Sequence, residues 1–504
     1  MKRVKHAGVV IAVCLEKKDS PKRVSPIQQN IIKGKNMKSR FCPSPTGHLH
    51  LGNMRTALFN ALLAQQKKGV FLLRIEDTDK VRSEDEYTES LKQDLHWLNL
   101  SWGEGPDVGG AAGPYWQSQR QAVYDRYYQQ LQDKGLVYPC FCSEQELMVT
   151  RKLQLSAGQP PRYSGKCAGL SAEKIAQLRA QGLPESLSFH IEKGQSIEFV
   201  DLVKGPQKFN SDDIGDFIIR RHDGTSPFMF CNGIDDATMG VTHALRGEDH
   251  LTNTPKQLLI LNALGLTPPH YGHVSLILGR DGSPLSKRNG SRSIKELREE
   301  GYLPIAVLNY LSRLGHYYEN PAFMDWSQLV EKFSLSALSV SPARFDPEHL
   351  LHWQREAIQR ASIDEIKAWC GNKIKAYVPS EKLDVFFSVI KGNILFPEEA
   401  VVWAHAIFDD HLVMGDQEKQ ILHEAGQSFF EAAHDAVLTH EEDFKSLSQA
   451  LSQKTDKKGK MLFLPLRIAL TGQMHGPDMP ALCRLLGVEK MKKRFEDAIH
   501  VWRK

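Results

Sequence analysis

The segment at 53–69 carries its apolar residues at helical spacing and therefore predicts a helix. Its apolar face consists of Ala57, Leu58, Ala61 and Leu62. Two lysines lie near the end of the segment, and Gly69 follows as the expected stop. Residues 39–45 predict a short strand that runs into a turn. The apolar run VFLLRIED at 70–77, which ends in charge, predicts a buried parallel strand.

This order of strand, helix and strand is typical of a right-handed crossover unit in a parallel α/β sheet. In such sheets, ligands bind at the carboxyl ends of the strands. Two unusual strings stand at those ends, FCPSPTGHLHLGN at 41–53 and RIEDTDK at 74–80. We therefore expect both strings to line a ligand-binding site.

From about residue 330 onwards, the apolar residues take helical spacing throughout. Examples are the strings DWSQLVEKF, SIDEIKAWC and MPALCRLLGVEKMKKRFEDAIHVW. This pattern predicts an all-helical C-terminal part.

The composition is that of an ordinary globular protein, with 41% hydrophobic and 25% charged residues among 504. This length suggests about two to four domains. No apolar run approaches the roughly 20 residues needed to span a bilayer. The eight cysteines are mostly scattered, which favours a reducing compartment over a disulfide framework.

Positive charge is concentrated in the first segment of the chain. Residues 1–36 hold nine Lys/Arg and two Asp/Glu, a balance of +7 against +4 for the whole chain, so the remainder is −3. Any binding of nucleic acid must then depend on local patches. The apolar run at 7–15 superficially resembles a signal peptide, but Glu16 ends it and no small-residue cleavage site follows. We expect residues 1–36 to be a disordered basic tail, or to precede a working start at Met37, with targeting as the alternative.

The stretch at 41–53 has the chemistry of a phosphate site. Gly47 and Gly52 let the backbone approach a ligand closely. The N-terminus of the following helix offers free N–H groups and a partial positive charge. His48 and His50 are placed to donate hydrogen bonds to phosphate oxygens. A surface turn with histidines is the alternative for this stretch taken alone.

A second string, GRDGSPLSKRNG at 279–290, places Lys287 and Arg288 on a Gly-rich loop. Adjacent cations on such a loop can close over a triphosphate and neutralise the charge of a phosphoryl-transfer transition state. By itself, this string favours a basic surface turn.

Together, the two strings resemble the paired signatures of the class I aminoacyl-tRNA synthetases, abbreviated HIGH and KMSKS. The strings PSPTGHLHLGNMRTALFNALLA, RIEDTD, GPYWQSQR, VTHALRGEDHLTNTPKQ and PLSKRNG occur in this order. With NYLSRLG, FDPEHLLHW and MLFLPLRIALTGQMHGPD further on, they resemble the bacterial glutamyl-tRNA synthetases from about Ser39 to the C-terminus.

The resemblance implies an α/β Rossmann-like catalytic domain with an inserted acceptor-binding domain, followed by an all-α C-terminal anticodon-binding bundle. We expect the catalytic domain at 37–330, its insertion at about 115–225, and the anticodon-binding region at 331–504. The implied reaction joins glutamate to ATP and then transfers the glutamyl group to the 3′ end of tRNA. Mg²⁺ is expected with ATP, held by phosphate oxygens and water, without an assigned protein ligand. We expect a cytoplasmic monomer that does not associate with membranes.

The resemblance also implies roles for individual residues. Arg40 would hold the side-chain carboxylate of glutamate, Glu76 its ammonium group, and Ser44 and Arg246 would complete the pocket. Arginine suits this task because its planar guanidinium matches a carboxylate with two hydrogen bonds. A structural ion pair with Glu248 or Asp249 is the alternative for Arg246. ATP contacts are expected from His48, His50, the backbone around Gly52, Lys287 and Arg288, with His48, His50 and Lys287 also acting in catalysis.

Some positions depart from the family pattern. Pro284 stands where the family often has the first lysine of its second signature, and Phe228 stands where a pocket tyrosine is common. Asn232 is a candidate to compensate for the missing hydroxyl group.

Cys140, Cys142 and Cys167 resemble the zinc knuckle of some family members. Zinc takes four ligands, and the histidine usual in the family is replaced here by Gly169. Tyr163 is a weak substitute, so the pattern slightly favours a metal-free knuckle over zinc.

The partner is expected to be tRNA-Glu, tRNA-Gln or both, and the sequence leaves this choice open. Basic candidates for anticodon contact are Lys454, Lys457, Lys458, Lys460 and the run 490–494. Three further readings are weaker. An adenylyltransferase without tRNA, or an enzyme that glutamylates a base within tRNA, would lack the helical C-terminal part. A non-catalytic RNA-binding protein would be favoured by loss of His50 or Lys287, and both are present.

Overall fold

The computed structural model describes residues 37–78, 83–159, 161–285 and 292–500. Its centre is a parallel four-stranded sheet with the strand order β2-β1-β8-β9. The bounds of these strands are β1 Lys38–Phe41, β2 Val70–Leu73, β8 His243–Gly247 and β9 His270–Val274. The first crossover, from β1 through helix α2 (Leu51–Gln66) to β2, pairs Lys38 with Val70 and Phe41 with Leu73. The predicted strand–helix–strand unit is therefore confirmed.

Helix α2 ends before Gly69, and the reason for the glycine differs from the expected one. The positive φ of 53° that terminates the helix belongs to Lys68. Gly69 is needed instead for a close approach, since a Cβ atom there would lie 2.2 Å from the carbonyl oxygen of Met37. The same glycine lets Val70 donate its N–H to that carbonyl, which aligns β2 with β1.

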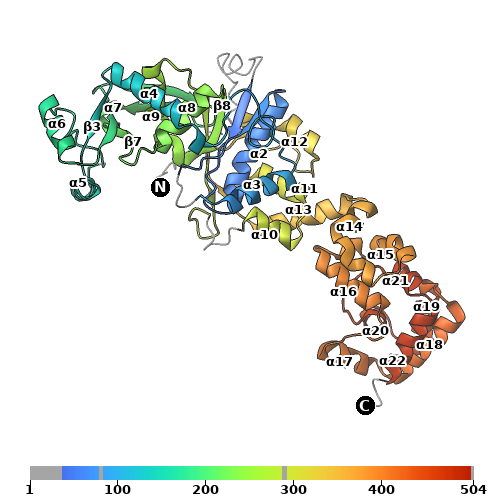
Figure 1. The fold of residues 1–504 in the computed structure, drawn as a ribbon. Coiled ribbons are helices and arrows are strands. Elements are labelled where there is room, and N and C mark those ends of the chain that lie inside the picture. The colour runs from blue at the N-terminus through green and yellow to red at the C-terminus, as the bar shows by residue number, and fades with distance from the viewer. Residues whose placement is uncertain (1–36, 79–82, 160, 286–291, 501–504) are drawn as a thin grey trace, which may run out of the picture.

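A long insertion separates β2 from β8 in the chain and lies to one side of the sheet (Figure 1). It contains a three-stranded antiparallel sheet of the order β3-β4-β7 and a β5–β6 hairpin. The strands are β3 Val137–Cys140, β4 Ser186–Phe189, β5 Ser196–Asp201, β6 Gly205–Asn210 and β7 Phe217–Arg220. The helices between β2 and β8 are α3 Asp85–Trp97, α4 Gln121–Asp133, α5 Glu144–Ser156, α6 Ala172–Ala180, α7 Ser211–Ile214 and α8 Phe228–Thr238.

After β8, helices follow almost without interruption. Those near the sheet are α9 Thr254–Leu264, α10 Ile294–Glu300, α11 Pro304–Arg313, α12 Trp326–Lys332 and α13 Pro347–Arg360, with the short pair β10 Ile277–Leu278 and β11 Ala343–Arg344. The helices of the far end are α14 Ile363–Cys370, α15 Leu383–Ile390, α16 Pro397–Phe408, α17 Asp416–Ala425, α18 Gln427–His440, α19 Phe444–Thr455, α20 Lys460–Thr471, α21 Met479–Leu486 and α22 Val488–His500. This all-helical end confirms the second part of the expected fold class.

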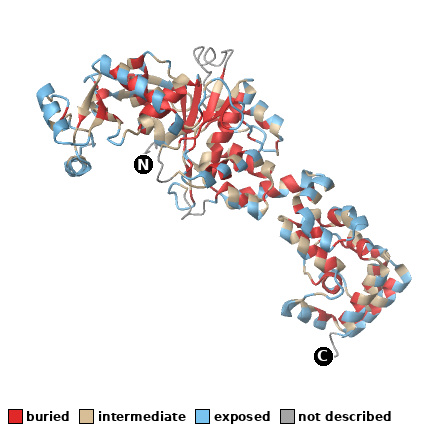
Figure 2. Ribbon diagram, in the orientation of Figure 1, coloured by how far each residue is buried: buried red, intermediate tan, exposed pale blue. Residues whose placement is uncertain are grey.

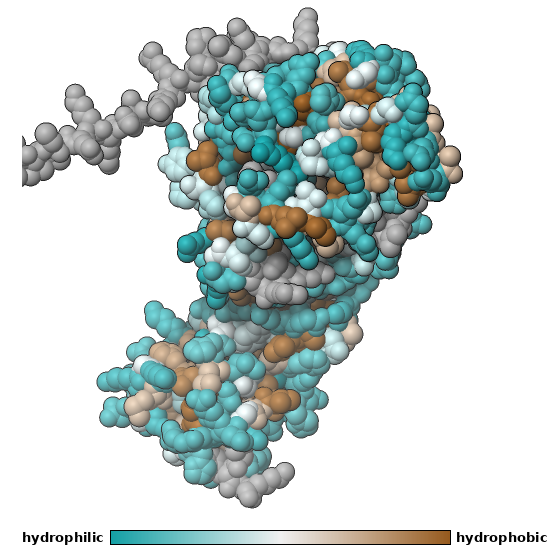
Figure 3. Space-filling view, turned by 90° about the vertical axis from the view of Figure 1, so that its left-hand side faces the viewer, coloured by the Kyte–Doolittle hydropathy of each residue, from teal (hydrophilic) through white to brown (hydrophobic). Residues whose placement is uncertain are grey.

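Two main hydrophobic cores divide the molecule, and α13 contributes to both. The first core surrounds α2 and includes Leu350, Trp353 and Ala357 of α13. The second core fills the helical end and begins with Ile358. Figure 2 shows these two buried centres, whereas the outer helices of the insertion are largely exposed. The face that carries the insertion is mainly hydrophilic, with separate hydrophobic patches (Figure 3).

Within the described ranges, no helix has both the length and the apolar character required to cross a membrane. The cysteines of these ranges are all free thiols.

Candidate active site

A cleft of about 700 Å³ opens at the carboxyl ends of β1 and β8. The expected site residues that line it are Arg40, Ser44, His48, His50, Gly52, Glu76, Phe228 and Arg246. Asn232 is fully buried and does not line the cleft. Lys287 and Arg288 lie outside the described residues. The two strings expected at the strand ends, at 41–53 and 74–80, thus meet in one site through their described residues.

His50 caps helix α2, and this cap sets the protonation of its ring. The backbone N–H of Gly52 donates to His50 Nδ1 over 3.1 Å, so this nitrogen carries no proton. Burial lowers the pKa of His50, which favours the neutral ring. The proton of the neutral ring must therefore sit on Nε2, which can donate to a phosphate oxygen.

His48 is held by helix α3. Its Nδ1 lies 3.1 Å from the hydroxyl oxygen of Ser90, and its ring meets the ring of Tyr87 edge to face, with the centroids 5.2 Å apart. Ser90 and Tyr87 are three residues apart on one face of α3. These contacts fix the orientation of the His48 ring in the wall of the cleft.

The described flanks of the second signature string adjoin the first signature. Pro284 and Leu285 line the cleft, and Leu285 donates its backbone N–H to Ile277. On the other flank, Ser293 forms a β-bridge with His50, and Ile294 donates its N–H to the carbonyl of Leu49 over 2.9 Å. Both sides of the segment at 286–291 are therefore anchored beside the histidines.

A network of buried charges lies beneath the cleft. Asp236 of α8 accepts hydrogen bonds from Arg40 over 3.2 Å and from Arg74 over 2.8 Å. Arg40 also donates to the carbonyl of Leu245 on β8. Burial alone would raise the pKa of Asp236, but the two arginines outweigh burial and hold the pKa below its usual value. The network joins β1, the end of β2, α8 and β8.

Glu76 extends this network to the surface of the cleft. Its Oε1 accepts hydrogen bonds from Arg74 over 2.8 Å and from Asn232 over 2.7 Å. Burial raises the pKa of Glu76, although Arg74 opposes this effect. In the part of the chain that the structure describes, the hydrogen bonds of this carboxylate end on Oε1. Asn232 is thus occupied with positioning Glu76, and its own oxygen accepts from Gln257.

Arg246 is buried at the end of β8 and held on three sides. Its Nη2 donates to Thr254 over 2.8 Å, its Nε donates to His273 over 3.1 Å, and its guanidinium lies 4.6 Å from the ring centroid of Tyr271. Nη1 has no hydrogen-bond partner among the described residues. The alternative ion pair with Glu248 or Asp249 is not formed, and Glu248 pairs with Lys204 instead. Arg246 lines the cleft, and its buried Nη1 is a donor without a partner among the described residues.

Phe228 stacks on His250, with ring centroids 4.7 Å apart and an angle of 30° between the planes. Burial lowers the pKa of His250 to about 4, so this ring is neutral near pH 7. Both rings line the cleft.

The three cysteines of the expected knuckle come together in the insertion. Their sulfur atoms lie within 4.8 Å of one another. The Tyr163 hydroxyl lies 3.5 Å from the sulfur of Cys140 and 3.4 Å from that of Cys142. Tetrahedral zinc places its sulfur ligands about 3.8 Å apart, and Cys142 and Cys167 are separated by 3.7 Å. The donor set of three thiols and one hydroxyl fits a zinc ion.

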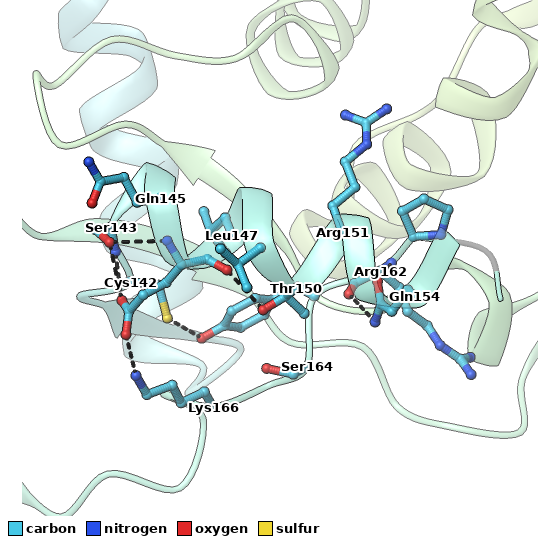
Figure 4. A pocket seen from close by; sticks show the side chains of 14 residues that line it. Cys142, Ser143, Gln145, Leu147, Thr150, Arg151, Gln154, Arg162, Ser164 and Lys166 are labelled. Carbon is cyan, nitrogen blue, oxygen red and sulfur yellow. Dashed lines mark hydrogen bonds and ion pairs between the residues drawn. The ribbon is translucent and has the colours of Figure 1, made fainter. Parts of the chain in front are cut away.

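A cleft of about 840 Å³ adjoins the cysteine cluster. Figure 4 shows Cys142 and Ser143 at one end of this cleft, and Arg151, Gln154 and Arg162 towards the other end. Of the three cysteines, Cys142 lines this surface groove.

Comparison with known proteins assigns the family. Residues 36–352 match the family "tRNA synthetases class I (E and Q), catalytic domain", and residues 373–499 match "Anticodon binding domain". A protein of Nitrosococcus oceani named glutamate–tRNA ligase 2 is 53% identical over 92% of this chain and 98% of its own. This chain belongs to the glutamate–tRNA ligase family of class I tRNA synthetases.

Further members of the family agree. A glutamate–tRNA ligase 2 of Coxiella burnetii is 50% identical, over 92% of this chain and 99% of its own. The crystal structure of a glutamate–tRNA ligase from Elizabethkingia meningosepticum, in complex with its amino acid, superimposes with a TM-score of 0.83 at 27% identity. It covers 92% of this chain and 99% of that chain. The likeness of this synthetase to its relatives therefore extends over both hydrophobic cores.

The sequence assigned no role to two groups that shape the site of this synthetase. Asp236 and His250 stand in the strings CNGIDD and RGEDH. A pair of adjacent acids in an otherwise apolar segment is a signal of buried ion pairing, and it could have identified Asp236. Nothing local in the sequence marks His250, because its stacking partner Phe228 lies on another element.

Replacing Asp236 by asparagine should destabilise this synthetase strongly. The change leaves two buried arginines with less compensating charge, which costs about 3–5 kcal/mol in the free energy of unfolding. Since the folded-state pKa of Asp236 is depressed, this difference should be present at pH 7 and shrink as the pH falls below about 4. Urea denaturation of both proteins at several pH values measures it.

The matched control is Asp364→Asn on α14. Asp364 is 88% exposed and pairs with Lys367 one turn along its helix, so its replacement should change the free energy of unfolding by less than about 0.5 kcal/mol. Equal effects of the two substitutions would contradict the role assigned to the buried network.

Proposed function

We propose that this chain activates glutamate with ATP and transfers the glutamyl group to the 3′ end of tRNA-Glu. The observation that carries the proposal is the set of groups gathered in the cleft at the carboxyl ends of β1 and β8. It contains an arginine with an unused donor, a buried carboxylate and a histidine with an Nε2 proton. These groups match the carboxylates, the ammonium group and the phosphates of the two small substrates.

Glutamate recognition is divided among groups of both charges. Arg40 and Arg246 supply the cations for its carboxylates, with Ser44 as an additional hydrogen-bonding group. The ammonium group binds Glu76 on Oε2, which accepts no hydrogen bond from the described residues. Binding of an ammonium group favours the charged form of Glu76, which opposes the effect of burial on its pKa. Asn232 acts through Glu76, which it positions.

ATP binds beside the two signature strings. His48, His50 and the backbone around Gly52 contact its phosphates, and Lys287 and Arg288 supply positive charge from the second signature. The α-carboxylate of glutamate attacks the α-phosphorus, and the bond to the pyrophosphate oxygen breaks. Such a reaction needs positioning and charge stabilisation more than a protein nucleophile. Mg²⁺, when bound to the phosphate oxygens, offsets part of their charge.

The remainder of the chain serves the tRNA. In this proposal, the insertion at about 115–225 contacts the acceptor end, and the helical region contacts the anticodon. In the basic run at 490–494, Arg494 is buried and donates hydrogen bonds to the backbone carbonyls of Leu470 and Asp409, so it stabilises the fold. Lys458 and Lys460 are exposed and are better candidates for RNA contact. The boundaries at 36 and 330, the monomeric state and the cytoplasmic location stay predictions.

We further propose that Cys140, Cys142 and Cys167 bind zinc, with Tyr163 as the fourth ligand. The sequence pattern slightly favoured a metal-free knuckle, because the usual histidine is missing. The position of the Tyr163 hydroxyl among the sulfur atoms supports the opposite choice. Zinc here would hold together an insertion whose helix α5 has no buried residue.

Aminoacylation with radiolabelled glutamate tests the function directly. Purified tRNA-Glu and tRNA-Gln are assayed separately with Mg·ATP, and we expect charging of tRNA-Glu alone. Charging of tRNA-Gln as well would contradict the proposed specificity and leave the chemistry intact. Failure to charge either tRNA would overturn the proposal.

Replacing Lys287 by alanine should slow glutamyl-adenylate formation by about 10²–10⁴-fold, because a positive charge that stabilises the transition state is lost. ATP–pyrophosphate exchange in the presence of tRNA measures this rate. Lys419→Ala, which removes an exposed lysine of α17, should leave the rate unchanged. An undiminished rate in the Lys287 variant would refute its role.

Elemental analysis of the purified protein should find about one zinc ion per chain. Cys167→Ser and Tyr163→Phe should each lower the zinc content after dialysis, and the cysteine change should have the larger effect. Cys370→Ser is the control, since this buried thiol lies in the distant helical core. A metal-free wild-type protein would support the sequence-based preference.

A further inference from the structure

A buried acid–base pair lies directly behind Arg246. Asp201 is the last residue of β5, and His273 lies on β9. His273 Nδ1 is 2.5 Å from Asp201 Oδ2, and both side chains are fully buried. His273 Nε2 receives the hydrogen bond from Arg246 Nε. The two residues do not line the cleft, and neither has a role in the proposed chemistry.

The direction of each hydrogen bond in this chain follows from the donors available. An arginine Nε–H can only donate, so His273 Nε2 is the acceptor of this bond and is unprotonated. The Thr254 hydroxyl oxygen lies 3.0 Å from the same nitrogen and can donate to it as well. The proton of the neutral ring is then on Nδ1, where it is donated to Asp201. The other oxygen of Asp201 accepts backbone N–H groups from Val203 over 2.9 Å and from Lys204 over 2.8 Å. Asp201 thereby selects the tautomer that can accept from Arg246.

The charges agree with this assignment. Burial lowers the pKa of His273, and the nearby Arg246 adds to this effect, while Asp201 opposes it. The pKa of Asp201 is below its usual value because hydrogen bonds from His273 and the backbone outweigh burial. An ionised Asp201, a neutral His273 and a charged Arg246 are therefore arranged in line.

We propose that Asp201 and His273 are positioning residues for Arg246, which they hold so that its Nη1 meets a carboxylate of glutamate. This inference rests on the proposed glutamate-binding role of Arg246. Thr254 and Tyr271 restrain the other sides of the guanidinium, but His273 alone accepts from Nε among the described residues. Without that acceptor, the guanidinium can rotate about its stem and the donor no longer faces the substrate.

The pair also connects the insertion to the glutamate pocket. Asp201 begins the turn of the β5–β6 hairpin, and the neighbouring Leu202 donates its backbone N–H to Tyr271 on β9. The β5–β6 hairpin of the insertion thus contributes Asp201 to the support of Arg246.

The first test is Asp201→Asn, which keeps the shape and the acceptor for the backbone N–H groups. The new amide N–H₂ donates to His273 Nδ1, so the ring proton must move to Nε2, where it faces Arg246 Nε–H. We expect the KM for glutamate to rise by about 10-fold to 100-fold, with the KM for ATP changed by less than about 3-fold. Nitrogen-15 NMR of histidine-labelled protein should show the change of tautomer at His273.

The second test compares His273→Gln with His273→Asn. The side-chain oxygen of glutamine can occupy the place of Nε2 and accept from Arg246, whereas asparagine reaches only the place of Nδ1. The glutamine variant should therefore retain glutamate affinity better than the asparagine variant. The reverse order of the two variants, or equal increases in the KM values for glutamate and ATP, would overturn the proposal.

His316 provides the matched control. It is also buried, and its Nε2 accepts the backbone N–H of Ser334 over 3.0 Å, away from the cleft. His316→Gln and His316→Asn should lower the melting temperature without a selective rise in the KM for glutamate. If wild-type protein does not use glutamate at all, the proposed function fails; if it does and the variants lack selectivity, only the positioning role fails.

Discussion

The buried charge network centred on Asp236 is the constraint on which the site depends. Charges without water are costly unless each is paired and hydrogen-bonded, and here Asp236 must meet Arg40 and Arg74 at once. The first arginine belongs to β1 and the second follows β2, so α8 has little freedom relative to the sheet. Arg40 also binds the carbonyl of Leu245, which ties β8 to the same point. This arrangement therefore fixes the positions of the elements that form the cleft.

Buried hydrogen-bond partners determine which atoms of the site donate and which accept. A backbone N–H sets the tautomer of His50, and the Asp201 carboxylate selects that of His273. In both rings, a protein group occupies Nδ1, and this contact determines whether Nε2 donates or accepts a hydrogen bond. Glu76 follows the same principle, since Arg74 and Asn232 occupy one oxygen. The site therefore offers fixed donors and acceptors before any substrate arrives, which is the basis of electrostatic preorganisation.

The two hydrophobic cores show how the catalytic and helical parts are joined. The first core continues through Phe333 and Phe345 into α13, and the second begins within the same helix. Helical spacing starts near residue 330 in the sequence, but spacing reports only local structure. It does not reveal which core a helix packs against, because that depends on elements that meet only in three dimensions.

The sequence by itself determined the first crossover unit, the all-helical C-terminal part and the family. The local patterns predicted β1, α2 and β2, because strand and helix periodicities are properties of neighbouring residues. The long matching strings identified the synthetase chemistry and brought Arg40, His48, His50 and Arg246 to attention. Only the tertiary structure decided which side chains meet. Asn232 supports Glu76, the Tyr163 hydroxyl lies beside the sulfur atoms of Cys140 and Cys142, and Asp201 and His273 stand behind Arg246. Such contacts join residues up to 156 positions apart, and hydrogen bonds in a closed interior are set by three-dimensional proximity and the exclusion of water, which no local pattern contains.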